Sequence, residues 1–140
     1  MKKASLKVLI YLIITIGWLS STGCTKSREI TGTWYWKSKN DYTELNLVQN
    51  KKQVSGGHCS NFKNGSKLDC TSSDSENSIT LHLVSENVYE GTIQSGFSEA
   101  VVNVRLTLNP NEETLHFKQL SQPSEEYYLP NNVYMTLAQP

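Results

Sequence analysis

The sequence predicts an all-β domain, most simply an antiparallel up-and-down β-barrel of about eight strands, with a β-sandwich as the alternative. Apolar and polar residues alternate at period two in several segments, which is typical of strands with one buried face. Turn-forming residues separate these segments at intervals of roughly 8–14 residues. Beyond the N-terminal segment, no stretch keeps the apolar spacing of a helix. Because most connections are short, strands that follow each other in the chain are expected to pair.

The alternation also fixes the expected strands and their inward faces. In residues 102–108, for example, even positions are apolar and odd positions are polar. The expected strands are 30–37, 42–49, 53–55, 78–84, 88–94, 99–108, 114–120 and 127–137. We expect Gly56-Gly57 to end the third strand, and 130–132 to kink the last one.

The N-terminal segment reads as a secretion signal. Lys2, Lys3 and Lys7 precede a run of 12 residues, 8–19, which is nearly all apolar. A membrane-spanning helix needs about 20 apolar residues, so this run fits the helical core of a signal peptide better.

Residues 20–24 (SSTGC) resemble the lipobox of bacterial lipoproteins. The resemblance implies a lipid on Cys24, cleavage just before it and acylation of the new amine, for example with palmitate. It also implies an outer-membrane location facing the periplasm, since the residue after the cysteine is Thr25 and not Asp. The domains would then be a signal peptide (1–23), a polar tether (24–29) and a barrel domain (30–140). An ordinary signal peptide or an uncleaved anchor, with Cys24 unmodified, is the alternative.

The charge balance changes once the signal is set aside. The whole chain has 13 basic and 13 acidic residues, and three of the basic ones lie within 1–23. The remaining 117 residues therefore carry ten basic and thirteen acidic residues, a net charge of −3. Such a domain has no general attraction for nucleic acid or for an anionic membrane surface. Contact with the membrane is expected only through the lipid.

The remaining two cysteines flank a hairpin signal. Asn64-Gly65 favours a two-residue type I′ turn, and folding the chain about it places Cys59 opposite Cys70. A two-residue turn would make them a hydrogen-bonded pair with Cα atoms about 5.5 Å apart, within disulfide range. The alternatives are free thiols, or a metal site with His58 and Asp69. Ten intervening residues do not match the usual cysteine spacing of zinc sites, so we expect a disulfide and no metal.

The start of the first strand, Gly32-Thr33-Trp34, resembles the G-x-W motif of lipocalins and related calycin barrels. The resemblance implies a tryptophan at the base of the barrel that packs against an arginine from a late strand. Arg105 is the only candidate for that arginine. With so few residues, the barrel is expected to be filled by side chains, namely Trp34, Leu45, Leu81, Val104 and Phe117.

Catalytic motifs are poorly represented in the sequence. Residues 60–63 (SNFK) match the S-x-x-K of penicillin-recognising enzymes, but they fall in a predicted hairpin and not on a helix. His82 and His116 are expected on outer faces, where they could form an exposed pair only if their strands were neighbours. We therefore expect no enzymatic activity and no cofactor.

Aromatic and lysine side chains are the candidate binding groups. In each of the pairs Tyr35/Trp36 and Tyr127/Tyr128, alternation sends one ring outward, where it can anchor an interface. Lysines flank the hairpin tip. The candidate binding residues are Tyr35, Trp36, Lys63, Lys67 and Tyr128. The sequence thus favours a lipid-anchored envelope protein that binds a protein partner, as inhibitors and immunity proteins do. A lipocalin-like carrier of a small apolar ligand is the alternative.

Overall fold

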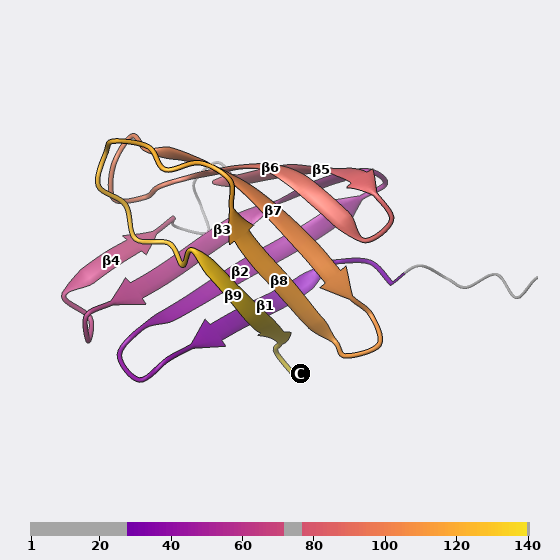
Figure 1. The fold of residues 1–140 in the computed structure, drawn as a ribbon, viewed down its shortest axis with the longest axis horizontal. Helices are drawn as coiled ribbons and strands as arrows, with labels where there is room; N and C mark the ends of the chain where they lie inside the picture. The colour runs from indigo at the N-terminus through magenta and orange to yellow at the C-terminus, as the bar shows by residue number, and fades with distance from the viewer. Residues whose placement is uncertain (1–27, 72–76, 140) are drawn as a thin grey trace, which may run out of the picture.

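The structure is a computed structural model that describes residues 28–71 and 77–139. The predicted signal peptide, Cys24 and most of the tether lie outside these residues. Within them, every regular element is a strand, and nine strands form one antiparallel sheet (Figure 1). The strands are β1 (Gly32–Lys37), β2 (Tyr42–Asn50), β3 (Gln53–Phe62), β4 (Lys67–Cys70), β5 (Ile79–Ser85), β6 (Val88–Gln94), β7 (Val101–Asn109), β8 (Thr114–Gln119) and β9 (Asn132–Leu137). No helix in the described part is long and apolar enough to span a membrane.

The sheet closes on itself into a barrel. The strand order is β2-β1-β9-β8-β7-β6-β5-β3-β4, and β2 also pairs with β3, which closes the ring. One edge of β3 is shared, because residues 53–56 pair with β5 and residues 59–62 pair with β4. β4 and β5 therefore lie along the same edge of β3 and together occupy one position in a ring of eight. This arrangement confirms the up-and-down barrel and excludes the sandwich.

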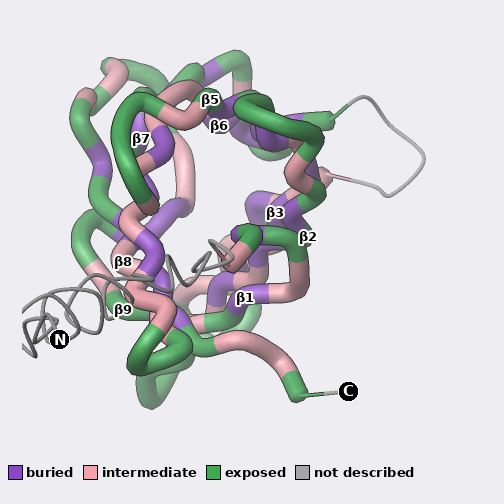
Figure 2. The backbone as a smooth tube through the Cα atoms, turned by 90° about the vertical axis from the view of Figure 1, so that its right-hand side faces the viewer, coloured by how far each residue is buried: buried purple, intermediate pink, exposed green. Residues whose placement is uncertain are grey.

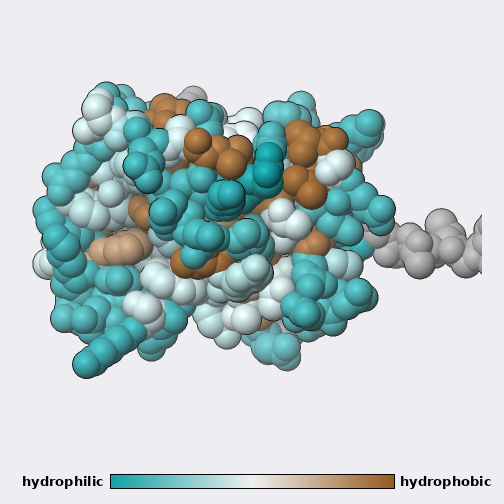
Figure 3. All heavy atoms as spheres, viewed as in Figure 1, coloured by the Kyte–Doolittle hydropathy of each residue, from teal (hydrophilic) through white to brown (hydrophobic). Residues whose placement is uncertain are grey.

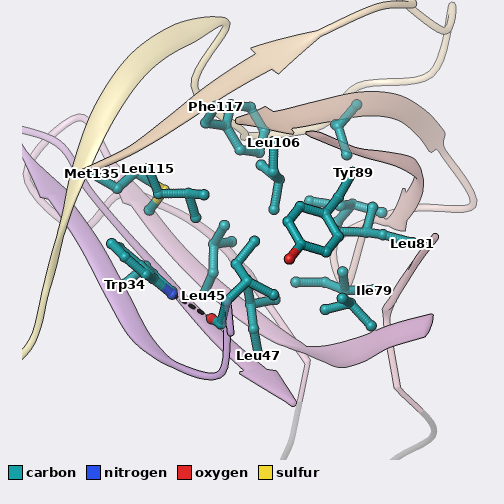
Figure 4. Close-up of a cluster of buried hydrophobic side chains, with 14 of the residues drawn as sticks. Trp34, Leu45, Leu47, Ile79, Leu81, Tyr89, Leu106, Leu115, Phe117 and Met135 are labelled. Atoms are coloured by element: carbon teal, nitrogen blue, oxygen red, sulfur yellow. Dashed lines mark hydrogen bonds between the residues drawn. The ribbon is translucent and has the colours of Figure 1, made fainter. Parts of the chain in front are cut away.

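Side chains from all around the ring meet in the barrel interior. Figure 2 shows buried positions interspersed with exposed ones along the strands, as the alternation predicts. The five side chains expected to fill the barrel are each at most 1% exposed, and all except Val104 are labelled in the interior cluster of Figure 4. Trp34 donates its indole N–H to the carbonyl of Ile30 at 2.8 Å, so its one polar group is satisfied inside the core.

Two expected strand boundaries are wrong. β3 does not end at the glycine pair but continues through it to Phe62. Gly56 is required there for close strand approach, because a Cβ at this position would lie 1.9 Å from the carbonyl oxygen of Asn46 on β2. The last strand begins only at Asn132, and residues 120–131 form a long connection instead.

Arg105 does not pack against Trp34, contrary to what the lipocalin resemblance implied. It lies between two inward-facing residues of β7 and therefore points outward. There its guanidinium pairs with Glu90 on β6, at 2.5 Å. The two outward histidines do not form a pair either, since β5 and β8 are not neighbours; His116 stacks instead on Tyr134 of β9.

The hairpin prediction is confirmed in register but not in turn length. Cys59 lies opposite Cys70, and the two form a disulfide. The turn has four residues, 63–66, and three of them (63–65) have positive φ. The Thr71 amide donates to the His58 carbonyl, which makes the adjacent cysteine pair a non-hydrogen-bonded one. Their Cα atoms are accordingly closer than expected, 3.9 Å apart.

The two ends of the barrel differ in the length of their connections. One end, which we call the hairpin end, carries the tight turns 51–52, 86–87 and 110–113. The chain enters the barrel there, where Arg28 pairs with Glu113 at 2.5 Å. The opposite end, the loop end, carries segments 38–41, 63–66, 95–100 and 120–131. Figure 1 shows these two ends at the right and left of the view.

Candidate functional site

A buried aspartate organises the loop end. Asp69 lies on the inward face of β4 and its side chain is fully buried. It accepts hydrogen bonds from five groups: His58 Nε2 (3.1 Å), Ser95 Oγ (2.8 Å) and the amides of Gly96 (2.6 Å), Phe97 (3.3 Å) and Tyr128 (2.9 Å). These groups come from β3 and from two loops that are distant in sequence. Asp69 therefore fastens both loops to the barrel wall.

The same contacts decide the ionisation of Asp69. Burial by itself would raise the pKa of this carboxyl group, because it disfavours the charged form. Hydrogen bonds from His58, from the Tyr128 amide and from Ser95, together with the charge of His58, outweigh burial and lower the pKa to about 2. Asp69 is thus an anion at neutral pH and can only accept hydrogen bonds.

Behind Asp69 lies a chain of polar side chains. His58 Nδ1 is 2.8 Å from Ser78 Oγ, which in turn is 3.1 Å from Thr71 Oγ1. A serine, a histidine and an aspartate in series are also the elements of hydrolase triads, where the serine must be reachable by substrate. In this protein His58 and Ser78 are only 2% and 7% exposed. The arrangement is that of a satisfied structural network, which joins β3, β4 and the start of β5.

The long connection 120–131 crosses the loop end. It leaves β8, reaches Asp69 through the Tyr128 amide and returns to β9, although β4 and β8 are not neighbours in the sheet. The side-chain amide of Gln119 anchors this connection by donating hydrogen bonds to the carbonyls of Leu129 and Pro130 at 3.1 and 2.9 Å. Leu129 is 7% exposed and belongs to the core cluster. The segment therefore covers the interior at this end.

A partly exposed cluster of side chains lies at the surface next to this network. Its residues are Lys67, Phe97, Glu126 and Tyr128, which we call the cation–aromatic cluster. The Lys67 ammonium lies 5.2 Å from the centre of the Tyr128 ring and 5.7 Å from that of the Phe97 ring, and the two rings meet edge to face at 4.9 Å. Glu126 accepts from the Tyr128 hydroxyl and lies 3.5 Å from the ammonium.

Contacts within the cluster shift the pKa values of Lys67 and Glu126. The hydrogen bond between Lys67 and Tyr128, together with the charge of Glu126, raises the pKa of Lys67. The hydrogen bond from Tyr128 and the charge of Lys67 lower the pKa of Glu126. Both groups are therefore ionised over a wide pH range, and the cluster presents a fixed cation, a fixed anion and two aromatic faces.

The structure brings only part of the predicted binding set together. Lys67 and Tyr128 meet in the cluster, and Lys63 is exposed nearby in the turn 63–66. Tyr35 is 39% exposed on the outer wall of β1. Trp36 points inward, as expected for one ring of the Tyr35/Trp36 pair, and packs against the core. The centre of its ring lies 6.3 Å from that of the Phe62 ring.

The sequence offers His58 and Asp69 only as alternative metal ligands and does not predict the network that they form with Ser78 and Ser95. His58 and Ser60 occupy the same face of β3, and Asp69 faces them from β4, so the disulfide register alone predicts that these residues share the inner face. The contacts from 95–97 and 128 carry no comparable signal, because these residues are 26 to 59 positions away from Asp69 in the sequence. Phe97 and Glu126 therefore could not be placed beside Lys67 from the sequence.

The metal alternative is not supported by the geometry. The cysteine sulfurs are bonded to each other, and the histidine and aspartate are paired inside the barrel. The described residues contain no group of three or more histidine, cysteine or acidic side chains that could hold a metal ion.

No family model, curated protein or solved structure matches the chain.

Proposed function

We propose that this protein is a lipid-anchored, non-enzymatic binding module of the cell envelope, whose cation–aromatic cluster contacts a protein partner in the manner of an inhibitor or immunity protein. The observation that carries the proposal is the preorganised cluster of Lys67, Phe97 and Tyr128. Aromatic and cationic side chains held in place before binding are typical of interface hot spots, because little side-chain entropy is lost when the partner arrives.

The position of the cluster supports this role. The chain enters at the hairpin end, and only four residue steps separate Arg28 from Cys24, a reach of at most about 14 Å. If Cys24 carries the lipid, the hairpin end lies close to the membrane. A ten-residue strand such as β3, tilted as in small barrels, spans about 25 Å along the barrel axis. The loop end would then project away from the bilayer, toward other envelope proteins.

A carrier function is less well supported. Large apolar side chains fill the interior, and Leu129 and Tyr127 from the crossing segment pack against them at the loop end. An apolar ligand would have to displace this packing. The surface at the loop end is covered mainly by hydrophilic side chains in the view of Figure 3, as suits a surface that stays in water until a partner binds.

The experiment is photo-crosslinking in intact cells that express the full chain. A photoreactive amino acid replaces Phe97 at the loop end, or Val84 on β5 near the hairpin end as a control of nearly equal exposure (46% and 45%). We expect a discrete protein adduct from position 97 only. Lys67→Glu should reduce its yield, since the substitution reverses the fixed cation of the cluster.

Equal labelling from both positions, or labelling of lipid alone from position 97, would contradict a protein interface at the loop end. The anchor is tested separately by mass spectrometry of the N-terminal peptide. A lipid-modified Cys24 is expected, and Cys24→Ser should release the protein from the membrane fraction.

A further inference from the structure

A second polar site lies on the outer wall, beside the loop end but apart from the cation–aromatic cluster. Two hydrogen bonds join the turn 38–41 to the turn 63–66. The backbone N–H of Asn64 donates to the carbonyl of Asn40, and the backbone N–H of Lys63 donates to Asp41 Oδ1, both at 3.0 Å. A pocket of about 190 Å³ lies between and beneath the turns. It is lined by Lys37, Ser38, Lys39, Asn40, Asp41, Tyr42, Asn61 and Asn64.

Three of the lining residues form a row across the sheet. Lys37 on β1 pairs with Tyr42 on β2, which pairs with Asn61 on β3. All three point outward, so Tyr42 occupies the middle position of the row. The Tyr42 hydroxyl donates to Glu44, and burial, reinforced by this hydrogen bond, raises the tyrosine's pKa to about 12. The ring therefore stays neutral and fixed in place.

One atom of the pocket has no partner. Asn61 Oδ1 is buried and accepts no hydrogen bond from any residue that the structure describes. A buried acceptor without a partner is costly, and it is satisfied when a ligand brings a hydrogen-bond donor to it. Lys37 and Lys39 form no ion pair with any described residue. The pocket thus offers an acceptor and one carboxylate to a donor, and two ammonium groups to an anion.

These groups limit the class of ligand. Every lining residue is polar, which disfavours an apolar molecule. Two ammonium groups and a single carboxylate disfavour a metal cation. Inorganic phosphate would satisfy the lysines, but at neutral pH it donates poorly to Asn61 and gains nothing from the Tyr42 ring. A sugar ring has hydroxyl donors, an apolar face for the tyrosine and, in an acidic sugar, a carboxylate for the lysines.

We infer that this pocket binds one unit of a carboxylate-bearing saccharide, with a hydroxyl group on Asn61 Oδ1, the ring against Tyr42 and the carboxylate on Lys37 and Lys39. The volume is below the range of about 300–1,000 Å³ for pockets that enclose drug-sized ligands, and it suits a single ring. This site is independent of the protein interface proposed above, because it uses none of the residues of the cation–aromatic cluster.

The test is a titration of the ¹⁵N-labelled full chain in detergent micelles, followed by NMR. The probes are glucuronate, glucose and acetate. A ligand of this size bound with ordinary efficiency has a Kd of about 1 mM, so we expect glucuronate to bind in that range. The amide shifts should be confined to residues 37–42 and 61–64. Glucose and acetate, each with only part of the required chemistry, should bind more weakly.

Two variants separate the contributions. Asn61→Leu removes the unpaired acceptor and should weaken glucuronate binding at least about fivefold. Replacing Lys37 and Lys39 together by glutamine should weaken glucuronate about threefold and leave glucose unchanged. Asn103→Leu, the same change at an exposed position of β7, is the control and should bind like the parent.

Several outcomes would overturn the inference. These are the absence of shifts with glucuronate, acetate binding as tightly as glucuronate, or unchanged affinity in Asn61→Leu with its NMR spectrum otherwise native. Acetate binding of equal strength would mean that the lysines attract any carboxylate.

Discussion

Asp69→Asn gives the sharpest test of how the loop end is held together. The five donors around Asp69 need an acceptor-only group, and an asparagine would turn one of its two oxygens into an NH₂ group. Whichever way the amide is turned, that NH₂ faces at least one backbone N–H that cannot move away. An unsatisfied buried donor and the loss of a buried ionic contact together predict a loss of about 3 kcal/mol in the free energy of unfolding at neutral pH.

The pH dependence of this loss is also determined. The pKa of Asp69 is about 2 in the folded protein, against 3.8 in an unperturbed side chain. Because the folded-state value is the lower one, the contribution to stability is fully present above pH 3.8 and is lost as the pH falls toward 2. The difference in pKa corresponds to about 2 kcal/mol. The difference in stability between the parent and Asp69→Asn should therefore shrink by about that amount between pH 7 and pH 2.

The assay is urea unfolding of residues 24–140 with Cys24→Ser at several pH values, followed by tryptophan fluorescence, which reports the exposure of Trp34 and Trp36 as the core opens. Glu112→Gln, the same chemical change at an exposed turn position, is the control and should stay within about 0.5 kcal/mol of the parent at every pH. A loss below about 1 kcal/mol for Asp69→Asn at pH 7, or an equal loss at pH 2, would refute the assigned role.

Three further predictions concern the barrel itself. Reduction of the disulfide should lower the free energy of unfolding by about 2–3 kcal/mol, and mass spectrometry should find no free thiol in that pair without reductant. Gly56→Ala should lower the free energy of unfolding by about 3 kcal/mol, because the new Cβ meets a main-chain oxygen. Gly57→Ala should lower it by under about 1 kcal/mol, since the nearest atom to its Cβ is in a side chain at 3.3 Å. Equal losses for the two variants in urea unfolding would count against this explanation. Phe117→Ala should cost about 3–5 kcal/mol because the ring is buried, and Phe97→Ala, at 46% exposure, should change stability by less than about 1 kcal/mol in the same assay.

The sequence was a good guide wherever the signal was local. Period-two alternation identified the inward residues of β7, and the Asn64-Gly65 turn gave the register that pairs the cysteines. The sequence-based prediction failed where a contact between distant strands outweighed the local preference of a residue. The glycine pair was expected to end a strand, but Gly56 serves the close approach of β2 to β3.

The candidate sites were predictable only in part. Lys63, Lys67 and Tyr128 were chosen as exposed cations and aromatics, and two of these three do meet. The choice could not include Phe97, because the loop that carries it is held in place by Asp69, 28 residues earlier. The outer pocket was not foreseen either, since it exists only because two turns more than 20 residues apart bond to each other.

By itself, the sequence determined an all-β antiparallel fold, its inward faces and its disulfide, since alternation and turn chemistry act between residues that are near in the chain. The closing of the ring, the division of one strand position between β4 and β5, and the fastening of two loops by Asp69 were decided only by the tertiary structure. A buried charge must find its donors wherever the fold brings them, and here they come from three separate segments of the chain. That requirement places the cation–aromatic cluster at the end of the barrel opposite the point where the chain enters.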